Sequence, residues 1–155
     1  MSFFNSMNIA ASGLTANRVR MDMISENIAN VNTTRTADGE PFRRRTVIFE
    51  TITDNDPFNL VFNNVFGDWG GLSPVPQGTG VRVSQIVEDQ SPGLLQFDPT
   101  HPDADENGYV RMPNVNIVEE MVNMISATRS YEANITAMQN FRTLTQRTLE
   151  IGQGR

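Results

Sequence analysis

Between residues 7 and 31, apolar side chains recur at alternating steps of three and four, the spacing that keeps them on one face of an α-helix. This seam predicts an amphipathic helix over 3–31, with Asn17 as its one polar interruption. At 1.5 Å per residue such a helix would be about 43 Å long. The seam consists of Met7, Ala10, Leu14, Asn17, Met21, Ile24, Ile28 and Val31.

A second seam near the C-terminus predicts a helix over 116–151. Asn116 with Glu119 three residues later resembles a capping box, and Gly152 follows the last apolar position. This helix would be about 54 Å long. Its apolar stripe consists of Ile117, Met121, Met124, Thr128, Tyr131, Ile135, Met138, Phe141, Leu144 and Ile151.

The residues between the two seams have a different pattern. Runs rich in Val, Ile, Thr and Phe predict β-strands over 42–53 and 81–88. Residues 54–80 mix aromatic side chains with Asn, Gly and Pro, which favours a loop or a hairpin over a helix, and 91–113 is dense in turn residues. The chain therefore divides into an N-terminal helical segment (1–36), a β-strand and loop segment (37–113) and a C-terminal helical segment (114–155).

The predicted fold is mainly α, with long N- and C-terminal helices packed in a coiled-coil-like array around a small β/loop middle segment. Two interpretations of the seams stay open: an antiparallel helix pair inside one chain, or helices that pack against those of other subunits. A compact domain of this length would be only about 28–30 Å across, so a 54 Å helix would leave part of its apolar stripe in water. The lengths therefore favour packing between subunits.

Composition and charge narrow the possible functions. The 155 residues include no Cys, which excludes disulfides, thiolate metal sites and thiol catalysis. The net charge of −6 argues against a nucleic-acid-binding protein, and no apolar run is long enough for a membrane span. Charge is also segregated: 1–45 has six Arg and four acids, 46–110 has one Arg and ten acids, and 111–155 has five Arg and four acids.

Candidate sites for chemistry are weak. Asp103, Asp105, Asn107 and Gly108 match the start of a calcium-binding loop, but Asn114 stands where the closing Glu is needed, so we interpret the run as a turn. His101, the only histidine, has no second ligand in its pattern. The motifs of serine hydrolases, P-loop enzymes, zinc proteases and dinucleotide-binding enzymes are all absent. We therefore expect no enzyme activity, no cofactor and no metal.

Three consecutive arginines occupy 43–45, at the start of the first predicted strand. In a strand they would divide between the two faces, so they do not form a continuous basic surface. We expect them to pair with the acidic middle segment of a neighbouring subunit, or else to lie on a solvated face. The N-terminus lacks the basic and apolar stretches of a cleaved secretory signal, which predicts a cytosolic protein or one exported without cleavage.

Two motifs resemble bacterial flagellar rod and hook proteins. The first runs from ASGLTA (11–16) to SENIANVNT (25–33), and the second from NGYVRMPNVN (107–116) to EEMVNMISATRSYEAN (119–134). Their order and spacing, with DGEPFR (38–43) and Phe49, are most similar to a proximal rod protein. The resemblance implies a structural subunit that assembles helically into the rod, which is the axial drive shaft and export channel that transmits torque. Family members are shorter in the middle, so 54–80 is interpreted as an insertion.

The resemblance also implies partners and location. The partners would be other proximal rod proteins, the adapter that joins the rod to the MS ring, the distal rod protein and the flagellar type III export apparatus. The subunit would reach the periplasmic rod of the basal body without a cleaved signal, in a helical hetero-oligomer that involves no nucleic acid and does not span the membrane. The residues expected at subunit interfaces are Met7, Ala10, Leu14, Asn17, Met21, Ile24, Asn27, Ile28, Asn30, Val31, Ile117, Met121, Met124, Thr128, Tyr131, Ile135, Met138, Phe141 and Leu144.

Three alternatives remain at the level of sequence. A cytoplasmic coiled-coil adaptor or chaperone would show the same seams. A cell-wall hydrolase could use acidic residues of 98–106, because paired carboxylates meet in space rather than in sequence. A sibling rod or hook subunit would share the terminal helices, although the 107–134 motif argues against it.

Overall fold

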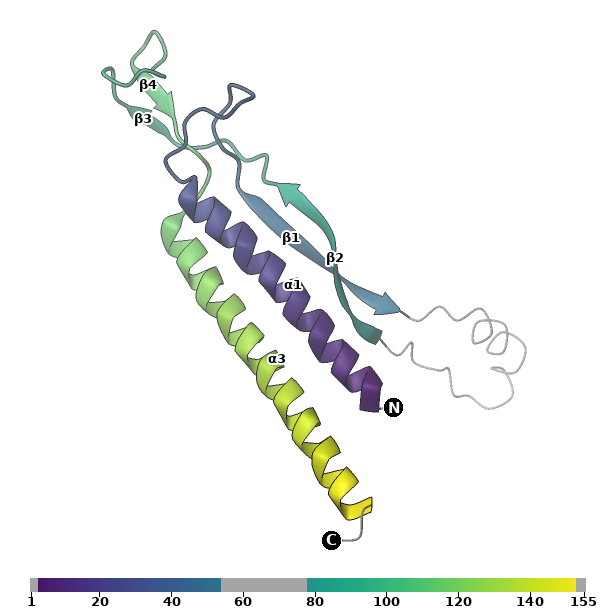
Figure 1. The fold of residues 1–155 in the computed structure, drawn as a ribbon. Helices are drawn as coiled ribbons and strands as arrows, with labels where there is room; N and C mark the ends of the chain where they lie inside the picture. Colours follow the sequence, from purple (N-terminus) through teal and green to yellow (C-terminus); the bar gives the residue numbers. More distant parts are fainter. Residues whose placement is uncertain (1–2, 54–77, 153–155) are drawn as a thin grey trace, which may run out of the picture. The chain divides into compact units, whose positions relative to one another are not determined.

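The computed structural model describes residues 3–53 and 78–152, which form two helices and four strands (Figure 1). Helix α1 is Phe3–Ala29 and helix α3 is Ile117–Gly152. Strands β1 (Arg45–Thr53) and β2 (Gly78–Glu88) run in opposite directions in one two-stranded sheet. Strands β3 (Leu95–Phe97) and β4 (Tyr109–Arg111) form a second sheet. The predicted fold of two long terminal helices with a small β middle segment is confirmed.

Contacts divide the chain into two compact units, and α1, α3 and the β1–β2 sheet each contribute to both. The described part of unit 1 comprises 3–16, 49–53, 78–82 and 134–152, and unit 2 comprises 17–48 and 83–133. Each unit therefore combines pieces of all three predicted segments. The predicted division into 1–36, 37–113 and 114–155 follows the sequence pattern and does not coincide with the two compact units.

In unit 1, small side chains let α1 approach α3 and the sheet closely. Ala10 and Ala16 are buried, and a Cβ added to Gly13 would lie 3.0 Å from the amide of Asn134 on α3. Close approach of this kind needs small residues, because any larger side chain would separate the two backbones. Ala10, Gly13 and Ala16 of α1 thus pack inside the chain.

The sheet of unit 1 is held to α1 by a serine hydroxyl. Ser12 Oγ donates to the carbonyl of Ile9 at 2.7 Å and accepts from the N–H of Val81 at 3.1 Å. Gly80, which precedes Val81, has a φ of +150°, and a Cβ there would lie 2.5 Å from Ser12 Oγ. Glycine is therefore required at this crossing, both for its backbone conformation and for space.

In unit 2, α1 lies between the start of β1 and α3. Asn27 of α1 forms hydrogen bonds to Arg45 of β1 and to Glu120 of α3. Met21, six residues before Asn27 on α1, contacts Thr128, eight residues after Glu120 on α3. These two pairs show that α1 and α3 run antiparallel. Ile24 and Ala127 are buried in this unit, with Ala127 wholly inaccessible.

A small hairpin completes unit 2. Residues Leu95, Gln96 and Phe97 of β3 pair with Arg111, Val110 and Tyr109 of β4. The Phe97 and Tyr109 rings pack edge to face at 5.3 Å on one side, while Val110 is buried on the other. The N–H of Asp98 donates to the carbonyl of Gly108 at 2.9 Å and closes the connecting loop.

The predicted helix ends are nearly right, and the side chains explain the differences. α1 ends two residues before the predicted end, where Asn30 Nδ2 donates to the Glu26 carbonyl at 2.9 Å and so satisfies a terminal helix acceptor. At the start of α3, Asn116 Oδ1 accepts from the N–H of Val118 at 3.0 Å, which confirms the predicted cap. Glu119 does not complete a capping box, because its carboxylate lies 3.4 Å from Arg44 Nη2.

The strand predictions are partly confirmed. β1 begins three residues after the predicted start at 42, and β2 begins at Gly78 rather than at 81. β3 and β4 lie inside 91–113, where only turns were predicted, because strands of three residues are too short to show alternation. The predicted loop or insertion over 54–80 falls outside the described residues except for 78–80. No helix of the described chain is long and apolar enough to cross a membrane.

Candidate functional site

A buried asparagine joins α1 to the start of β1. The side chain of Asn27 is 1% exposed, its Oδ1 accepts from the N–H of Arg45 at 2.9 Å, and its Nδ2 donates to the carbonyl of the same residue at 2.9 Å. An amide group matches a peptide unit in donor and acceptor, so Asn27 pairs with Arg45 as a neighbouring strand would. This contact fixes the position at which β1 crosses α1 in unit 2.

A buried carboxylate joins the same asparagine to α3. Glu120 is 1% exposed, and its Oε2 accepts from Asn27 Nδ2 at 2.9 Å. Its Oε1 lies 2.8 Å from both Nε and Nη2 of Arg44, and the N–H of Arg44 is held by Asn114 Oδ1 at 2.8 Å. A carboxylate is tolerated in a protein interior only when it is paired and hydrogen-bonded, and both conditions are met here.

Arg45 extends this cluster toward the sheet. Its Nη1 lies 2.8 Å from Glu26 Oε1, its Nη2 lies 3.1 Å from Glu88 Oε1, and its guanidinium is 5.8 Å from the centre of the Phe42 ring. We call Glu26, Asn27, Arg44, Arg45, Glu88 and Glu120 the polar junction of unit 2. It connects α1, β1, β2 and α3 through charged and amide groups.

The expectation for the arginine run is wrong at Arg44 and Arg45. Both pair with acids of their own chain rather than with a neighbouring subunit or with solvent alone. Arg43 likewise contacts Glu40 and Gln90. The reason is topological: the run lies where β1 crosses both helices, and Glu26 and Glu120 belong to those helices.

The polar junction is suited to positioning rather than to catalysis. Its carboxylates are engaged by arginines, and its members include no thiol, hydroxyl or imidazole that could act as a nucleophile or a general base. Buried polar groups of this kind are best attested as devices that fix the register of packed helices. In unit 2 the junction fixes α1, α3 and β1 against one another.

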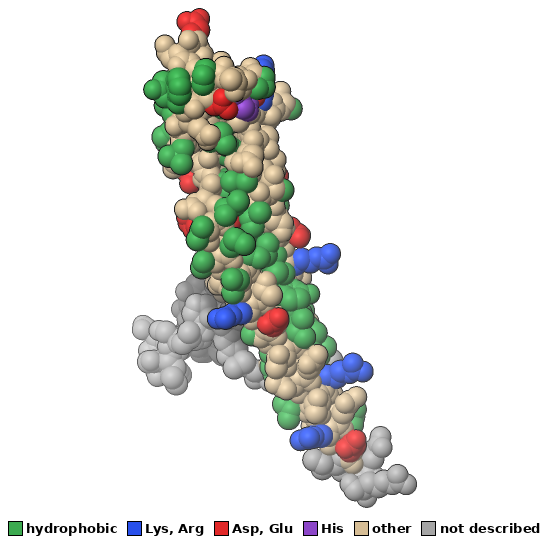
Figure 2. All heavy atoms as spheres, turned by 90° about the vertical axis from the view of Figure 1, so that its left-hand side faces the viewer, with side chains coloured by type: hydrophobic (Ala, Val, Ile, Leu, Met, Phe, Trp, Pro, Cys, Tyr) green, Lys and Arg blue, Asp and Glu red, His purple; other side chains and the backbone are tan. Residues whose placement is uncertain are grey.

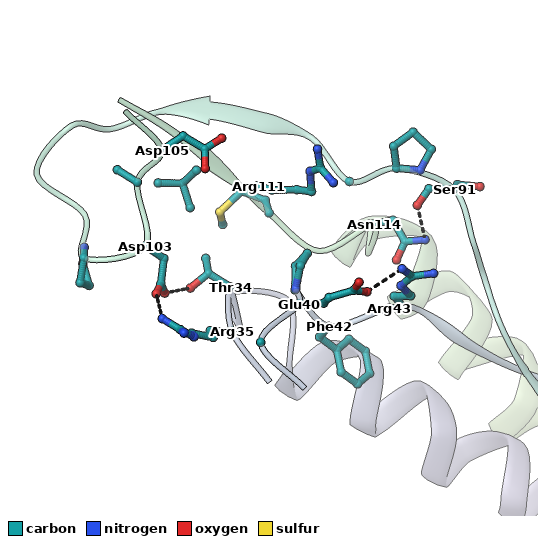
Figure 3. A pocket seen from close by; sticks show the side chains of 18 of the residues that line it. Thr34, Arg35, Glu40, Phe42, Arg43, Ser91, Asp103, Asp105, Arg111 and Asn114 are labelled. Atoms are coloured by element: carbon teal, nitrogen blue, oxygen red, sulfur yellow. Dashed lines mark hydrogen bonds and ion pairs between the residues drawn. The ribbon is translucent and has the colours of Figure 1, made fainter. Parts of the chain in front are cut away.

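A cavity of about 660 Å³ lies beside the junction in unit 2 (Figure 3). The charged side chains on its walls are mostly paired with one another. Asp103 accepts from Thr34 Oγ1 at 2.8 Å and lies 3.5 Å from Arg35 Nη1, and Arg43 Nη2 lies 2.6 Å from Glu40. The two Asp103 contacts tie the 34–43 loop to the hairpin loop, so these cavity walls hold two loops together.

The calcium-like run and the histidine have structural roles in the turns of unit 2. Asp103 is engaged by Thr34 and Arg35, and the N–H of Gly108 donates to the Asp105 carbonyl at 2.8 Å. His101 Nδ1 accepts from the N–H of Asp103 at 3.1 Å. Among the residues that the structure describes, no group of three acidic or histidine side chains could hold a metal ion.

Two aspartates form turns with a hydroxyl residue two positions later. The hydrogen bond from the Ser91 hydroxyl lowers the pKa of Asp89 most, and the hydrogen bond from the Ser91 N–H lowers it further. The Thr100 hydroxyl and N–H lower the pKa of Asp98 in the same way. Each hydrogen bond favours the ionised carboxylate over the protonated form.

We expect these turns to loosen only in acid. Because both pKa values are depressed in the folded chain, the stabilisation is complete above the ordinary aspartate pKa and is lost as the pH falls through the lowered value. Carboxyl-carbon NMR titration should show Asp98 titrating below its ordinary range, and Thr100→Val should raise that pKa. Unchanged titration in Thr100→Val would contradict the assignment.

The structure places the predicted interface residues in two groups. Fifteen are buried or half-buried within their own unit, and four are exposed. The buried ones are Ala10, Ile24 and Asn27. The half-buried ones are Met7, Leu14, Asn17, Met21, Ile28, Asn30, Val31, Met124, Tyr131, Ile135, Met138 and Phe141, and the exposed ones are Ile117, Met121, Thr128 and Leu144.

Two exposed apolar surfaces lie in unit 2, and Met121 is the one residue of them that was selected from the sequence. The first is a stripe on the outer face of α3, formed by Val118, Met121, Val122 and Ile125, with Val122 60% exposed. The second lies on the hairpin, at Leu94, Leu95, Phe97 and Tyr109 (Figure 2). The stripe has its own i, i+3, i+4, i+7 spacing, so this signal was present in the sequence beside the stronger seam.

Comparison with known proteins gives a consistent result along the chain. Residues 7–35 match the family described as flagella basal body rod protein, and 106–151 match the family described as flagellar basal body rod FlgEFG protein C-terminal. The first match covers most of α1, and the second covers the hairpin strand β4 with nearly all of α3.

Relatives match over nearly the whole chain. The flagellar basal-body rod protein FlgC of Borreliella burgdorferi is 48% identical, and that of Bacillus subtilis is 45% identical. The protein of the same name from Salmonella typhimurium is 35% identical. In all three cases the alignment covers 99% of this chain and 100% of the relative.

Proposed function

Because the chain belongs to the FlgC family of flagellar basal-body rod proteins, we propose that the exposed parts of its terminal helices are the surfaces through which it packs into the rod. Family membership makes the chain a structural subunit of the basal-body rod and not an enzyme. The polar junction is consistent with that role, because it holds the elements of unit 2 in fixed positions.

One observation carries the proposal. The α3 stripe presents Val118, Met121, Val122 and Ile125 on one side of the helix, each more than half exposed. Apolar side chains grouped in this way favour burial against a partner, since covering them removes apolar area from water. A helix of a neighbouring rod subunit has the shape to cover a stripe of this spacing.

The partners in this proposal are other proximal rod proteins, the adapter that joins the rod to the MS ring, and the distal rod protein. The subunits assemble helically around an export channel and transmit torque along the rod. Support comes from the two rod-family matches, which fall on the two terminal helices. Many parallel side-chain contacts resist slippage better than one small contact would.

The location follows the same proposal. The subunit leaves the cytoplasm through the flagellar type III export apparatus without a cleaved signal, and it becomes part of the periplasmic rod. The seam residues of α1 and α3 that are half-buried within each unit would add their remaining exposed area to the contacts between subunits. The exposed Ile117, Met121, Thr128 and Leu144 are proposed as direct interface residues.

We expect the double variant Val122→Asp/Ile125→Asp to abolish rod assembly and motility while leaving the isolated subunit folded. Both side chains are exposed, so the free energy of unfolding should change by no more than about 0.5 kcal/mol. Two carboxylates at the centre of a helix–helix contact would instead be buried without partners. Electron microscopy of basal bodies and a swimming assay measure assembly, and urea unfolding measures the subunit.

The matched control is Ser126→Asp, which adds a charge to an exposed position of α3 about a quarter turn from the centre of the stripe. This variant should swim normally. Normal rods in the double variant would overturn the proposal. A strong helical signal in a small, discrete oligomer of the purified chain would favour a coiled-coil adaptor instead.

A further inference from the structure

The loop between β3 and β4 contains the only asparagine of the chain that is followed by glycine. This pair, Asn107 and Gly108, has the residue types that favour spontaneous deamidation. Glycine has no side chain to hinder approach of its backbone nitrogen to the asparagine amide, so the two groups meet more easily here than at the other asparagines. Asn107 is exposed in unit 2, so solvent reaches its side chain.

The reaction needs only this chain and water. The Gly108 nitrogen attacks Cγ of the Asn107 side chain, which closes a succinimide ring and releases ammonia with the proton of the Gly108 N–H. Water then adds to one of the ring carbonyls and breaks its bond to the nitrogen. Cleavage at one carbonyl gives aspartate at position 107, and cleavage at the other gives isoaspartate, in which the main chain runs through Cγ.

In the folded hairpin the Gly108 nitrogen is held in a hydrogen bond. Its N–H donates to the Asp105 carbonyl at 2.8 Å, and the N–H of Asp105 donates to the Tyr109 carbonyl at 2.9 Å. With the φ of +78° at Gly108, these bonds form a β-turn that ends in a glycine bulge. Attack on Asn107 requires a Gly108 nitrogen that has lost its proton, so the bond to Asp105 must open first.

An aromatic pair keeps this loop closed. A Cβ added to Gly108 would lie 3.0 Å from the Phe97 ring and 3.2 Å from Pro99, so the glycine lies against both side chains. The Phe97 and Tyr109 rings pack edge to face with their centres 5.3 Å apart, and such a pair stabilises beyond the area that it buries. Because loop opening separates these contacts, their strength sets the fraction of molecules in which Gly108 is free to react.

We propose that Asn107 is a site of spontaneous deamidation and that closure of the hairpin loop controls the reaction. The closed loop protects Asn107, and each opening exposes it to attack by Gly108. Isoaspartate does not fit the closed loop, because its additional main-chain carbon displaces Gly108 from Asp105. The reaction therefore makes a transient opening permanent and changes the apolar surface of the hairpin. The site does not depend on how subunits pack in the rod.

Mass spectrometry of the full chain tests the protection. The chain is incubated in mildly alkaline buffer, with and without denaturing guanidinium chloride, and the digested peptide of Asn107 is separated into amide, aspartate and isoaspartate forms. We expect deamidation to be at least about tenfold slower in the folded chain, since loop closing is much faster than the reaction and the rate follows the open fraction. Equal rates in the two solutions, or no reaction at Asn107 in denaturant, would overturn the proposal. Asn116, which precedes a β-branched residue, is the internal control and should react slowly in both.

Two substitutions on the hairpin separate loop opening from other effects. Phe97→Ala removes the ring pair with Tyr109 and should raise the deamidation rate of the folded chain about fivefold, with no change in denaturant. Leu94→Ala is the matched control, because Leu94 is 80% exposed and precedes β3, and it should leave both rates unchanged. Equal rates in the two folded variants would show that loop closure does not control the reaction.

Amide hydrogen exchange tests the effect of the product. Asn107→Asp supplies the aspartate form directly and should keep the N–H groups of Gly108 and Asp98 protected, because its main chain is unchanged. The isolated isoaspartate form should exchange both at least about tenfold faster than Asn107→Asp. Equal protection in the two forms would contradict a permanent opening of the loop.

Discussion

Arg44→Met should lower the free energy of unfolding by about 3–5 kcal/mol, the cost of leaving one partner of a buried ion pair uncompensated. Glu120 is 1% exposed, and without Arg44 its carboxylate keeps only the hydrogen bond from Asn27. Methionine fills much of the same volume, so the loss reports on the charge rather than on packing. Urea denaturation followed by circular dichroism measures the change.

The neighbouring arginine provides the control. Arg43 pairs with Glu40 at 2.6 Å, but both side chains are substantially exposed, so Arg43→Met should cost no more than about 0.5 kcal/mol. Arg44→Met/Glu120→Met removes both charges and should recover most of the loss, since two apolar groups need no partner. Equal effects of Arg43→Met and Arg44→Met would show that the junction does not act as a buried ion pair.

Asn27→Asp should be as damaging as Arg44→Met although it replaces a single NH₂ group with oxygen. The change removes the Nδ2 donor, which serves both the Arg45 carbonyl and Glu120 Oε2 at 2.9 Å. It also places a second carboxylate against the first in a site that is 1% exposed. Like charges in a poorly solvated site repel strongly, and we expect a loss of about 3–5 kcal/mol at neutral pH.

The pH dependence distinguishes this effect from a simple packing defect. Protonation of the introduced carboxyl restores a donor and removes the repulsion, so the loss should shrink as the pH falls from 7 toward 4. Asn8→Asp, at an exposed position of the same helix, should change stability by no more than about 0.5 kcal/mol. A pH-independent loss in Asn27→Asp would indicate that the lost hydrogen bonds alone account for the effect.

The helices could be predicted because their signals are local. Side chains three and four positions apart share a helix face whatever lies around them, and Asn116 caps the turn that immediately follows it. The hairpin could not be predicted in this way. Its strands have three residues each, and their pairing depends on Leu95 meeting Arg111, which lies sixteen positions later.

The candidate site was predicted less well than the fold. Asn27 was predicted to be an interface residue because it belongs to a family motif. Its side chain forms hydrogen bonds with Arg45 and Glu120 of the same chain. Its role in contacts between subunits stays a prediction. No role in a site was predicted for Glu120, because nothing in the sequence brings Arg44 beside it.

Sequence patterns alone predict two terminal helices and a short β middle segment, exclude thiol chemistry and contain the family motifs. Each of these depends on residue identity or on spacing within a few turns. The three-dimensional packing shows which apolar residues are covered within the chain and which, such as Val122 and Leu149, stay exposed. Burial and charge pairing depend on residues that are distant in sequence, and Asn27 and Glu120 meet across 93 positions.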